Sequence, residues 1–143
     1  LSADGQAVIT ETGYIAIDAA AEAFESDMSE GKIVVGGSSS VSPVMEKLAE
    51  AYQAINTNAE IEIQTTDSTT GVSNAIAGTY NIGMASRALK ATETEQGVTG
   101  ITIANDGIAV IVNNGNPTEE LTSEQVLGIY TGEITTWDAL AAE

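Results

Sequence analysis

Cysteine and histidine are both absent from the 143 residues of this sequence. Their absence excludes the usual zinc sites, histidine-based catalytic triads and thiol chemistry. The lack of cysteine is compatible with any redox compartment, so it does not place the protein in one. The sequence has no basic-apolar leader and no apolar run of about 18 residues, which a membrane-spanning helix would need. We therefore expect any signal or lipid anchor encoded by the full gene to lie outside this chain.

Basic residues are scarce. Four lysine and arginine residues stand against 21 aspartate and glutamate residues, which gives a formal net charge of −17 at pH 7. The cations are scattered along the chain as Lys32, Lys47, Arg87 and Lys90, so they do not build a basic patch. Binding to a nucleic-acid duplex or to an anionic membrane surface depends on such a patch. The composition therefore argues against both as partners.

The core is expected to be aliphatic, because 43% of the residues are hydrophobic but only 4% are aromatic. A chain of this length suits one domain of ordinary size. Its apolar residues recur with helix and strand periodicities, which argues against disorder. The acidic clusters at 22–30 and 119–120 are typical of solvated faces and lack the pattern of a calcium-binding loop. We expect no metal site and no cofactor.

Strands and helices alternate in the predicted order of elements. From residue 32 the order is β-α-β-α-β-β-α, with strands at 32–36, 59–66, 81–85 and 101–112 and helices at 41–55, 72–77 and 122–130. This order is typical of an α/β domain with a mainly parallel sheet flanked by helices. Before it, residues 2–12 are predicted to form a helix capped by Ser2, and residues 14–17 a short extended piece. Ligands of such sheets bind beyond the carboxyl ends of the strands.

Two turns of similar composition follow predicted strands and lead into predicted helices. They are Gly36–Val41 and Thr66–Val72, and both are rich in small and hydroxyl-bearing residues. Helix N-termini present unpaired N–H groups and a partial positive charge, and hydroxyls add further donors. Two such ends on neighbouring strands would converge on one small anion. The alternative is that both turns are ordinary helix caps, because serine, threonine and aspartate are the preferred capping residues.

Ser86 and Arg87 follow the third predicted strand, at the same edge of the sheet as the two turns. Arg87 is the only arginine of the chain, and its guanidinium suits bidentate contact with an oxyanion. The alternative is a surface arginine paired with one of the many carboxylates. Asp106 interrupts an apolar stretch and is followed by Gly107. Its carboxylate either accepts a hydrogen bond from a ligand or belongs to a bulge or turn.

Five segments of the chain together resemble the substrate-binding proteins of bacterial phosphate ABC transporters. They follow the family's order and spacing, and they are Val34–Tyr52, Ser68–Val72, Ala77–Arg87, Ile103–Asn113 and Leu121–Trp137. The resemblance implies a two-lobed, periplasmic-binding-protein-like fold that closes on inorganic phosphate about a hinge. It also implies a non-enzymatic, extracytoplasmic component of an importer, which delivers phosphate to a membrane permease.

The ligand-binding residues implied by the resemblance lie in three of these segments. The turn after the first strand supplies donors in the family, and these correspond to Ser39 and Ser40. The turn after the second strand supplies a serine, which corresponds to Ser68. Well-studied members then have an aspartate that accepts the proton of phosphate and so rejects sulfate. Ser86 stands at that place here, and the arginine after it would orient or neutralise the anion. We therefore expect Asp106 to replace the missing proton acceptor.

The predicted domain organisation departs from that of the family. Residues 1–17 resemble the family's last helix and final strand but stand before the first strand, and residues 18–31 are predicted to be a linker. Residues 32–112 would form the first lobe, and residues 113–143 the hinge crossing and the incomplete start of the second lobe. Either the parent protein has tandem copies and the chain spans their junction, or the fold is circularly permuted. An exposed inter-lobe surface would favour a homodimer.

Other interpretations of the sequence stay open. The same fold would suit another oxyanion, such as sulfate, molybdate or a small organic anion. The chain would alternatively be a structural or interaction module of a surface protein that binds no ligand. A hydrolase is the weakest interpretation, because without histidine or cysteine only a carboxylate or a lysine remains as a base.

Overall fold

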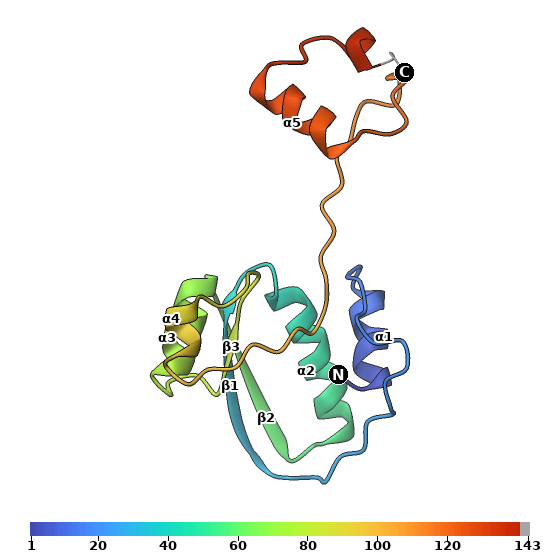
Figure 1. The fold of residues 1–143 in the computed structure, drawn as a ribbon. Helices are drawn as coiled ribbons and strands as arrows, with labels where there is room; N and C mark the ends of the chain where they lie inside the picture. Colours follow the sequence, from blue (N-terminus) through green and yellow to red (C-terminus); the bar gives the residue numbers. More distant parts are fainter. Residues whose placement is uncertain (141–143) are drawn as a thin grey trace. The chain divides into compact units, whose positions relative to one another are not determined.

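Residues 1–140 are described by the computed structural model, and the chain divides into two compact units. The first unit comprises Leu1–Gly107, and the second begins at Ile108. Among the described residues, every strand lies in the first unit (Figure 1). All the predicted ligand-binding residues, from Ser39 to Asp106, therefore belong to the first unit.

A three-stranded parallel sheet forms the centre of the first unit. β1 (Gly31–Ser38) lies between β2 (Ala59–Thr66) and β3 (Ile82–Met84), so the strand order is β2-β1-β3. Val35, in the middle of β1, is buried. The continuous apolar run that predicts a strand buried on both faces is thus the central strand of the sheet.

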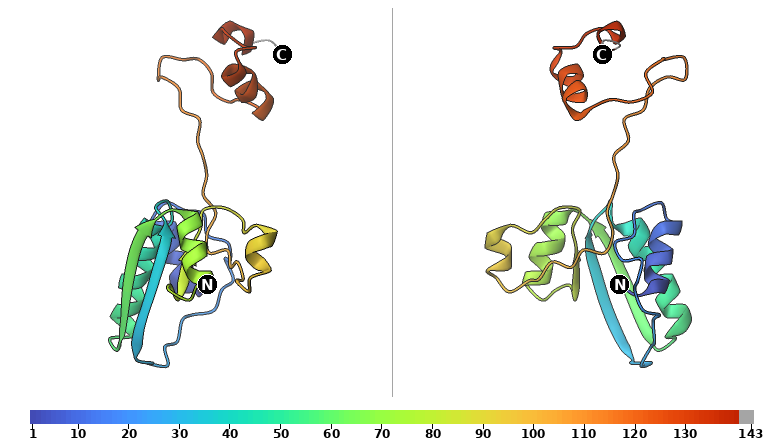
Figure 2. Two further views of the ribbon diagram at one scale, coloured as in Figure 1. Left: turned by 90° about the vertical axis from the view of Figure 1, so that its left-hand side faces the viewer. Right: turned by 45° about the vertical axis from the view of Figure 1, so that its right-hand side comes forward.

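The helices α2 (Ser42–Ile55) and α3 (Ser68–Ile76) cover opposite faces of this sheet (Figures 1 and 2). The handedness of the crossovers explains why. The chain moves across the sheet in one direction from β1 to β2 and in the other from β2 to β3. Right-handed crossovers then place the two connecting helices on different faces. The carboxyl ends of β1 and β3 flank the point where the strand order reverses, which is where such sheets bind ligands.

Glycine allows α3 to approach the strands closely. A Cβ atom on Gly71 would lie 2.6 Å from the carbonyl oxygen of Met84 and 2.7 Å from the Cα atom of Gly37. Gly37 has a φ of 141°, a conformation that residues with a side chain rarely adopt. The N-terminal half of α3 is thereby held against the ends of β1 and β3.

The N-terminal helix also packs on the first unit. α1 (Ala3–Glu11) has the predicted N-cap Ser2 and contacts α2. Its buried Gln6 joins two segments that are distant in the sequence. The side-chain oxygen of Gln6 accepts the N–H of Ile17 at 2.7 Å, and its side-chain nitrogen donates to the carbonyl oxygen of Ile103 at 3.4 Å. The N-terminal segment is thus an integral part of the unit that contains the sheet.

The predicted strand at 101–112 is wrong. Within it, only Asn105 makes a β-bridge, which is antiparallel and pairs with Ile15. Ile108 and Ile111 are 96% and 88% exposed. An apolar run becomes a strand only where a neighbouring strand accepts its hydrogen bonds and other layers cover its faces. Among the described residues, the part of this segment after Gly107 has neither a neighbouring strand nor a layer that covers its faces.

Two other helices differ from the prediction. α3 begins at Ser68 rather than Val72, because Asp67 caps it five residues before Val72, the first apolar residue of its buried face. A short helix, α4 (Ala91–Thr94), forms in the polar stretch after β3, where no helix is predicted. The remaining predicted elements are observed within a few residues of their expected bounds.

The second unit contains α5 (Ser123–Thr131) and the 3₁₀ helix η1 (Trp137–Leu140). A capping box begins α5, in which Thr122 Oγ1 accepts the N–H of Gln125 and the Gln125 side chain accepts the N–H of Thr122. Gly132 ends α5 with a φ of 80°. Of the helices in residues 1–140, none has the length and apolar character needed to cross a bilayer.

Candidate functional site

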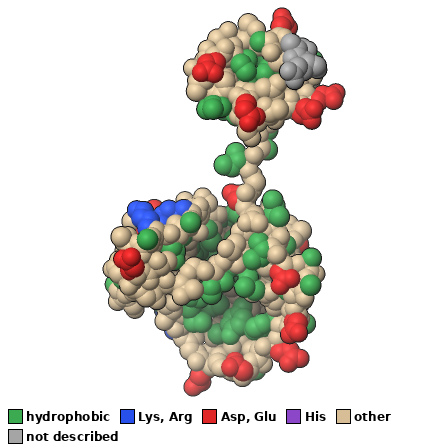
Figure 3. All heavy atoms as spheres, in the orientation of Figure 1, with side chains coloured by type: hydrophobic (Ala, Val, Ile, Leu, Met, Phe, Trp, Pro, Cys, Tyr) green, Lys and Arg blue, Asp and Glu red, His purple; other side chains and the backbone are tan. Residues whose placement is uncertain are grey.

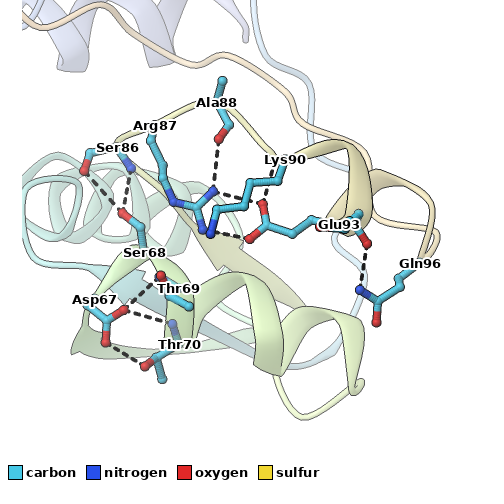
Figure 4. Close-up of polar contacts among 11 residues, drawn as sticks. Asp67, Ser68, Thr69, Thr70, Ser86, Arg87, Ala88, Lys90, Glu93 and Gln96 are labelled. Atoms are coloured by element: carbon cyan, nitrogen blue, oxygen red, sulfur yellow. Dashed lines mark hydrogen bonds and ion pairs between the residues drawn. The ribbon is translucent and has the colours of Figure 1, made fainter.

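Three serines from three different elements meet at the carboxyl edge of the sheet. Ser38 is the last residue of β1, Ser68 is the first residue of α3, and Ser86 lies in the loop after β3. Ser38 Oγ donates to Ser86 Oγ at 3.0 Å, and the Oγ atoms of Ser68 and Ser86 lie 3.3 Å apart. The N–H of Ser86 also donates to Ser68 Oγ at 3.1 Å (Figure 4). We call Ser38, Ser68 and Ser86 the serine cluster.

The hydroxyl protons of the serine cluster are not all used within it. Each hydroxyl has one proton to donate. The proton of Ser38 is donated to Ser86, and one hydroxyl proton serves the contact between Ser68 and Ser86. Whichever of these two serines donates in that contact, the other keeps a free proton. The cluster therefore has a hydroxyl donor left for a ligand.

Ser38 is the residue that sequence reasoning missed. It is buried, with 3% of its surface exposed, whereas the predicted ligand residues Ser39 and Ser40 lie in the following turn and are both exposed. The strand prediction ends at Gly36, but β1 continues for two more residues and pairs with β2 through Ser38. The small residues of Gly36–Ser38 are compatible with both a strand and a turn, so local sequence does not distinguish the two.

The two helix N-termini at this edge carry different charges. Val41, the N-cap of α2, makes no side-chain capping hydrogen bond. Asp67, the N-cap of α3, accepts the N–H groups of Thr69 and Thr70 at 2.8 and 3.0 Å, and the Thr70 hydroxyl at 2.6 Å. These bonds, chiefly those from Thr70, hold the pKa of the Asp67 carboxyl below its ordinary value. The second turn is thus a capped helix start with a negative charge, and the first turn is not.

Arg87 is paired with a carboxylate. Its Nη1 and Nη2 atoms donate to the two oxygens of Glu93 at 2.9 and 2.8 Å, and Nη1 also donates to the carbonyl oxygen of Ala88 (Figure 4). Glu93 belongs to α4 and is buried. Hydrogen bonds from the Arg87 side chain and from the Lys90 backbone lower the pKa of Glu93 to about 2. The same pairing raises the pKa of Arg87.

Two of the four cations of the chain, Arg87 and Lys90, belong to the loop that contains Ser86. Basic side chains gather near α3 and α4 in the space-filling view, while acidic side chains are spread over the surface (Figure 3). The serine cluster therefore lies beside two of the four cations of a protein of formal net charge −17. Glu93 and Asp67 are the carboxylates that face Arg87, so the charge near the cluster is balanced.

Asp106 stands apart from the serine cluster. It is exposed and follows Asn105, which pairs with Ile15. Tyr14 lies next to Ile15 and donates its hydroxyl proton to the carbonyl oxygen of Ser40 at 2.6 Å. The segment that contains Asp106 is thus linked to the first turn through residues 14 and 15. No hydrogen bond joins Asp106 to the serine cluster in the described part of the chain.

No metal centre accompanies the serine cluster in the part of the chain that the structure describes. Residues 1–140 hold no group of three or more carboxylates that suits a metal ion. A hollow of about 520 Å³ lies between α1 and α2, and Lys47 and Glu50, which form an ion pair, are part of its lining. We place the candidate site at the serine cluster instead, because it keeps a hydroxyl donor at a switch point of the sheet.

The chain is similar to proteins of known family. A family model described as a PBP superfamily domain matches residues 10–143. The chain is 50% identical over 141 residues to phosphate-binding protein PstS 2 of Streptococcus agalactiae serotype V, covering 99% of this chain and 48% of that protein. It is 38% identical over 139 residues to phosphate-binding protein PstS 2 of Streptococcus pneumoniae serotype 4, covering 97% and 47%. The chain spans about half the length of the curated relatives it matches.

Solved structures agree with these relatives. The crystal structure of a phosphate-binding protein of a phosphate ABC transporter from Streptococcus pneumoniae TIGR4 matches with a TM-score of 0.87 at 38% identity, covering 96% of this chain and 53% of that chain. A phosphate ABC transporter substrate-binding protein from Clostridium perfringens, solved with bound phosphate, matches with a TM-score of 0.65 at 43% identity, covering 79% and 46%.

Proposed function

This chain belongs to the PBP superfamily, and from that premise we propose that it binds inorganic phosphate as part of the substrate-binding component of an ABC importer. The relatives named above are phosphate-binding proteins, and they are not enzymes. The observation that supports the proposal most strongly is the serine cluster, which keeps a free hydroxyl donor at the switch point of the sheet.

The proposed site uses neutral donors on the chain's first unit. Ser68 or Ser86, whichever keeps its free hydroxyl proton, donates to one side of the anion, and Ser39 and Ser40 donate from the turn before α2. The N-terminus of α2 contributes its partial positive charge, because no side-chain cap satisfies it. Ser38 acts indirectly, since its hydrogen bond to Ser86 orients that hydroxyl.

Asp106 is the proposed proton acceptor. Its support is the link between its segment and the first turn, through the Asn105–Ile15 bridge and the hydrogen bond from Tyr14 to Ser40. A carboxylate at this position would accept the proton of a protonated phosphate and would repel fully ionised sulfate. Asp106→Asn is expected to reduce the preference for phosphate over sulfate and to leave the fold intact, because the residue is exposed.

Isothermal titration of the chain with phosphate, and with sulfate at the same ionic strength, tests the proposal. We expect saturable heat with phosphate. Ser68→Ala is expected to weaken binding about tenfold, because it removes a hydroxyl that contacts Ser86 and leaves the Ser86 N–H without its acceptor. Ser73→Ala, at an exposed position of the same helix, is the matched control. The absence of saturable heat with phosphate contradicts phosphate binding by this chain.

One observation favours a second candidate, the same fold binding another oxyanion. The contacts within the serine cluster come from hydroxyls and a backbone N–H, and these donors suit fully ionised sulfate as well as phosphate. Titration at several pH values separates the two candidates. Binding that changes as phosphate gains a proton supports the carboxylate acceptor, whereas equal affinity for sulfate at every pH supports the second candidate.

The partner and location of the whole protein follow from the proposed role. A substrate-binding component would deliver phosphate to a membrane permease and would act outside the cytoplasm. Within this organisation, residues 32–112 would form the first lobe and residues 113–143 the start of the second. A tandem copy or a circular permutation remains the proposed reason why residues 1–17 precede the first strand.

Association of two copies is also part of the proposal. Its support is the apolar segment Ile108–Val112, in which Ile108 and Ile111 are almost fully exposed. Burial of such residues on association is favourable. Sedimentation velocity is expected to show a dimer at high concentration, and Ile111→Lys is expected to shift the sample to monomer.

A further inference from the structure

Glu93 is the one buried acidic residue in residues 1–140, with 8% of its surface exposed. It belongs to α4, and its two carboxylate oxygens are both occupied. Oε1 accepts from Nη2 of Arg87, while Oε2 accepts from Nη1 of Arg87 and from the N–H of Lys90 at 2.7 Å. A single carboxylate thus holds both the guanidinium and the backbone of the loop that follows Ser86.

Within residues 1–140, the hydrogen bonds of Arg87 to Glu93 and Ala88 leave one edge of the guanidinium free. Arginine has five N–H donors in a fixed plane. Three of them are used, because Nη1 donates to Ala88 and Glu93 and Nη2 donates once to Glu93. The two that remain are the Nε–H and the second proton of Nη2. These two protons point in parallel from the same edge, and such a pair matches two oxygens of one oxyanion.

The position of the guanidinium relates this free edge to the serine cluster. Figure 4 shows the guanidinium of Arg87 between the Ser68–Ser86 pair on one side and Glu93 on the other. Ser86 immediately precedes Arg87, so the serine and the arginine are displayed by the same short loop. A buried carboxylate with a strong partner resists separation, which keeps the guanidinium in this orientation.

We propose that Glu93 is a positioning residue for anion binding, because it holds Arg87 so that the free Nε–Nη2 edge is presented to an oxyanion at Ser68 and Ser86. This inference rests on the proposed function. Its expected effect on affinity has the opposite sign to the effect expected from charge alone. A negative group near an anion site weakens binding by repulsion, whereas here its removal would weaken binding by releasing the arginine.

Phosphate titration of Glu93→Gln and Glu95→Gln tests the sign of this effect. Both variants remove one negative charge, but Glu95 is exposed and follows α4 without contacting Arg87 through any hydrogen bond of the described residues. Repulsion alone predicts equal or tighter binding for both. The positioning role predicts that Glu93→Gln binds phosphate about tenfold more weakly, while Glu95→Gln binds as the unmodified chain does. Equal affinities of the two variants overturn the inference.

A double-mutant cycle with Arg87→Lys shows whether Glu93 acts through the arginine. Lysine keeps a cation beside Glu93 but lacks the parallel pair of donors, so this variant keeps the buried carboxylate compensated. We expect Arg87→Lys to lose about as much affinity as Glu93→Gln, and the double variant to lose no more than either. Additive losses, or full affinity in Arg87→Lys, overturn the inference. Circular dichroism verifies folding, and Arg87→Lys decides the question if Glu93→Gln fails to fold.

The unmodified chain is titrated first, which separates the inference from the proposed function. An unmodified chain that gives no heat with phosphate contradicts the proposed function, and the inference with it. An unmodified chain that binds phosphate leaves the inference to be decided by the Glu93 and Arg87 variants alone.

Discussion

The two strand-to-helix connections of the sheet resemble each other in sequence but differ in electrostatics. The connection from β1 to α2 ends at Val41, which makes no side-chain cap, and the connection from β2 to α3 ends at Asp67, which accepts three hydrogen bonds. An uncapped N-terminus keeps its donors and its partial positive charge for a ligand, whereas a capped one is satisfied by its own aspartate. Two similar small-residue turns therefore differ in charge, because the second begins its helix with an aspartate cap and the first does not.

The serine hydroxyls of the two connections also differ in their positions. In the first connection Ser38 is buried and contacts Ser86, and the two serines after it are exposed. In the second connection Ser68 joins the serine cluster from the first turn of the capped helix. A capped α3 thus holds one member of the cluster in place, while the first connection contributes Ser38 from the end of β1.

The largest expected effect comes from breaking the close packing of the second connection. Gly71→Ala places a Cβ atom 2.6 Å from the carbonyl oxygen of Met84, so α3 must move away from the strands, at a cost of about 1–3 kcal/mol in the free energy of unfolding. Urea unfolding measures this loss. Gly5→Ala in α1 is the control, because its Cβ atom meets only ordinary contacts and alanine is favoured in a helix. Equal stabilities of the two variants would contradict this account of the packing.

A smaller effect on stability is expected from removing the aspartate cap of α3, which makes the second connection uncapped like the first. Asp67→Ala removes the cap of α3 and is expected to lower the melting temperature by several degrees, because two helix N–H groups lose their acceptor. Asp67→Asn keeps an acceptor oxygen but not the charge, and should retain most of the stability. Thermal unfolding followed by circular dichroism gives both values. If Asp67→Asn falls as far as Asp67→Ala, the charge matters more than the cap.

The smallest effect concerns the ion pair between Arg87, in the loop after Ser86, and Glu93 of α4. The pKa of Glu93 is about 2 in the folded protein and 4.5 without its partners. A carboxyl with a lowered pKa stabilises the fold above its unfolded pKa, and this stabilisation is lost as the pH falls from about 4.5 to about 2. Arg87 and Lys90 are the charged groups that face Glu93. The difference in the free energy of unfolding between the unmodified chain and Glu93→Gln is therefore expected to shrink as the pH falls from about 4.5 to about 2. A difference that is constant with pH would contradict the pairing.

Much of the first unit could be predicted from local patterns. β2 has the predicted bounds, and the helix at 42–55 differs by one residue. Apolar periodicity and capping residues describe such elements well, because they depend on neighbours within a few residues. The segment at 101–112 failed for the opposite reason. Its apolar residues are typical of a strand, but a strand also needs a partner, and the pattern within one segment contains no information on partners.

The residues of the candidate site also differ in whether the sequence could predict them. Ser86 could be named from its place after the third strand, since the carboxyl ends of parallel strands meet at one edge, whereas Ser68 could be named from the resemblance to the phosphate-binding family. Ser38 could not be distinguished from its neighbours Ser39 and Ser40, because only the register of β1 on β2 shows that it is the last strand residue.

Composition, charge and periodicity were enough to derive an acidic α/β protein with hydroxyl-rich turns at one edge of a parallel sheet. These properties are sums over residues or regularities between close neighbours, so the linear chain expresses them fully. The partners of individual side chains belong to the folded state alone. Ser38 meets Ser86 across 48 residues, and Arg87 meets Glu93 rather than one of the 20 other acidic residues, because the packing of α3 and the loop after β3 sets which groups come within hydrogen-bonding distance.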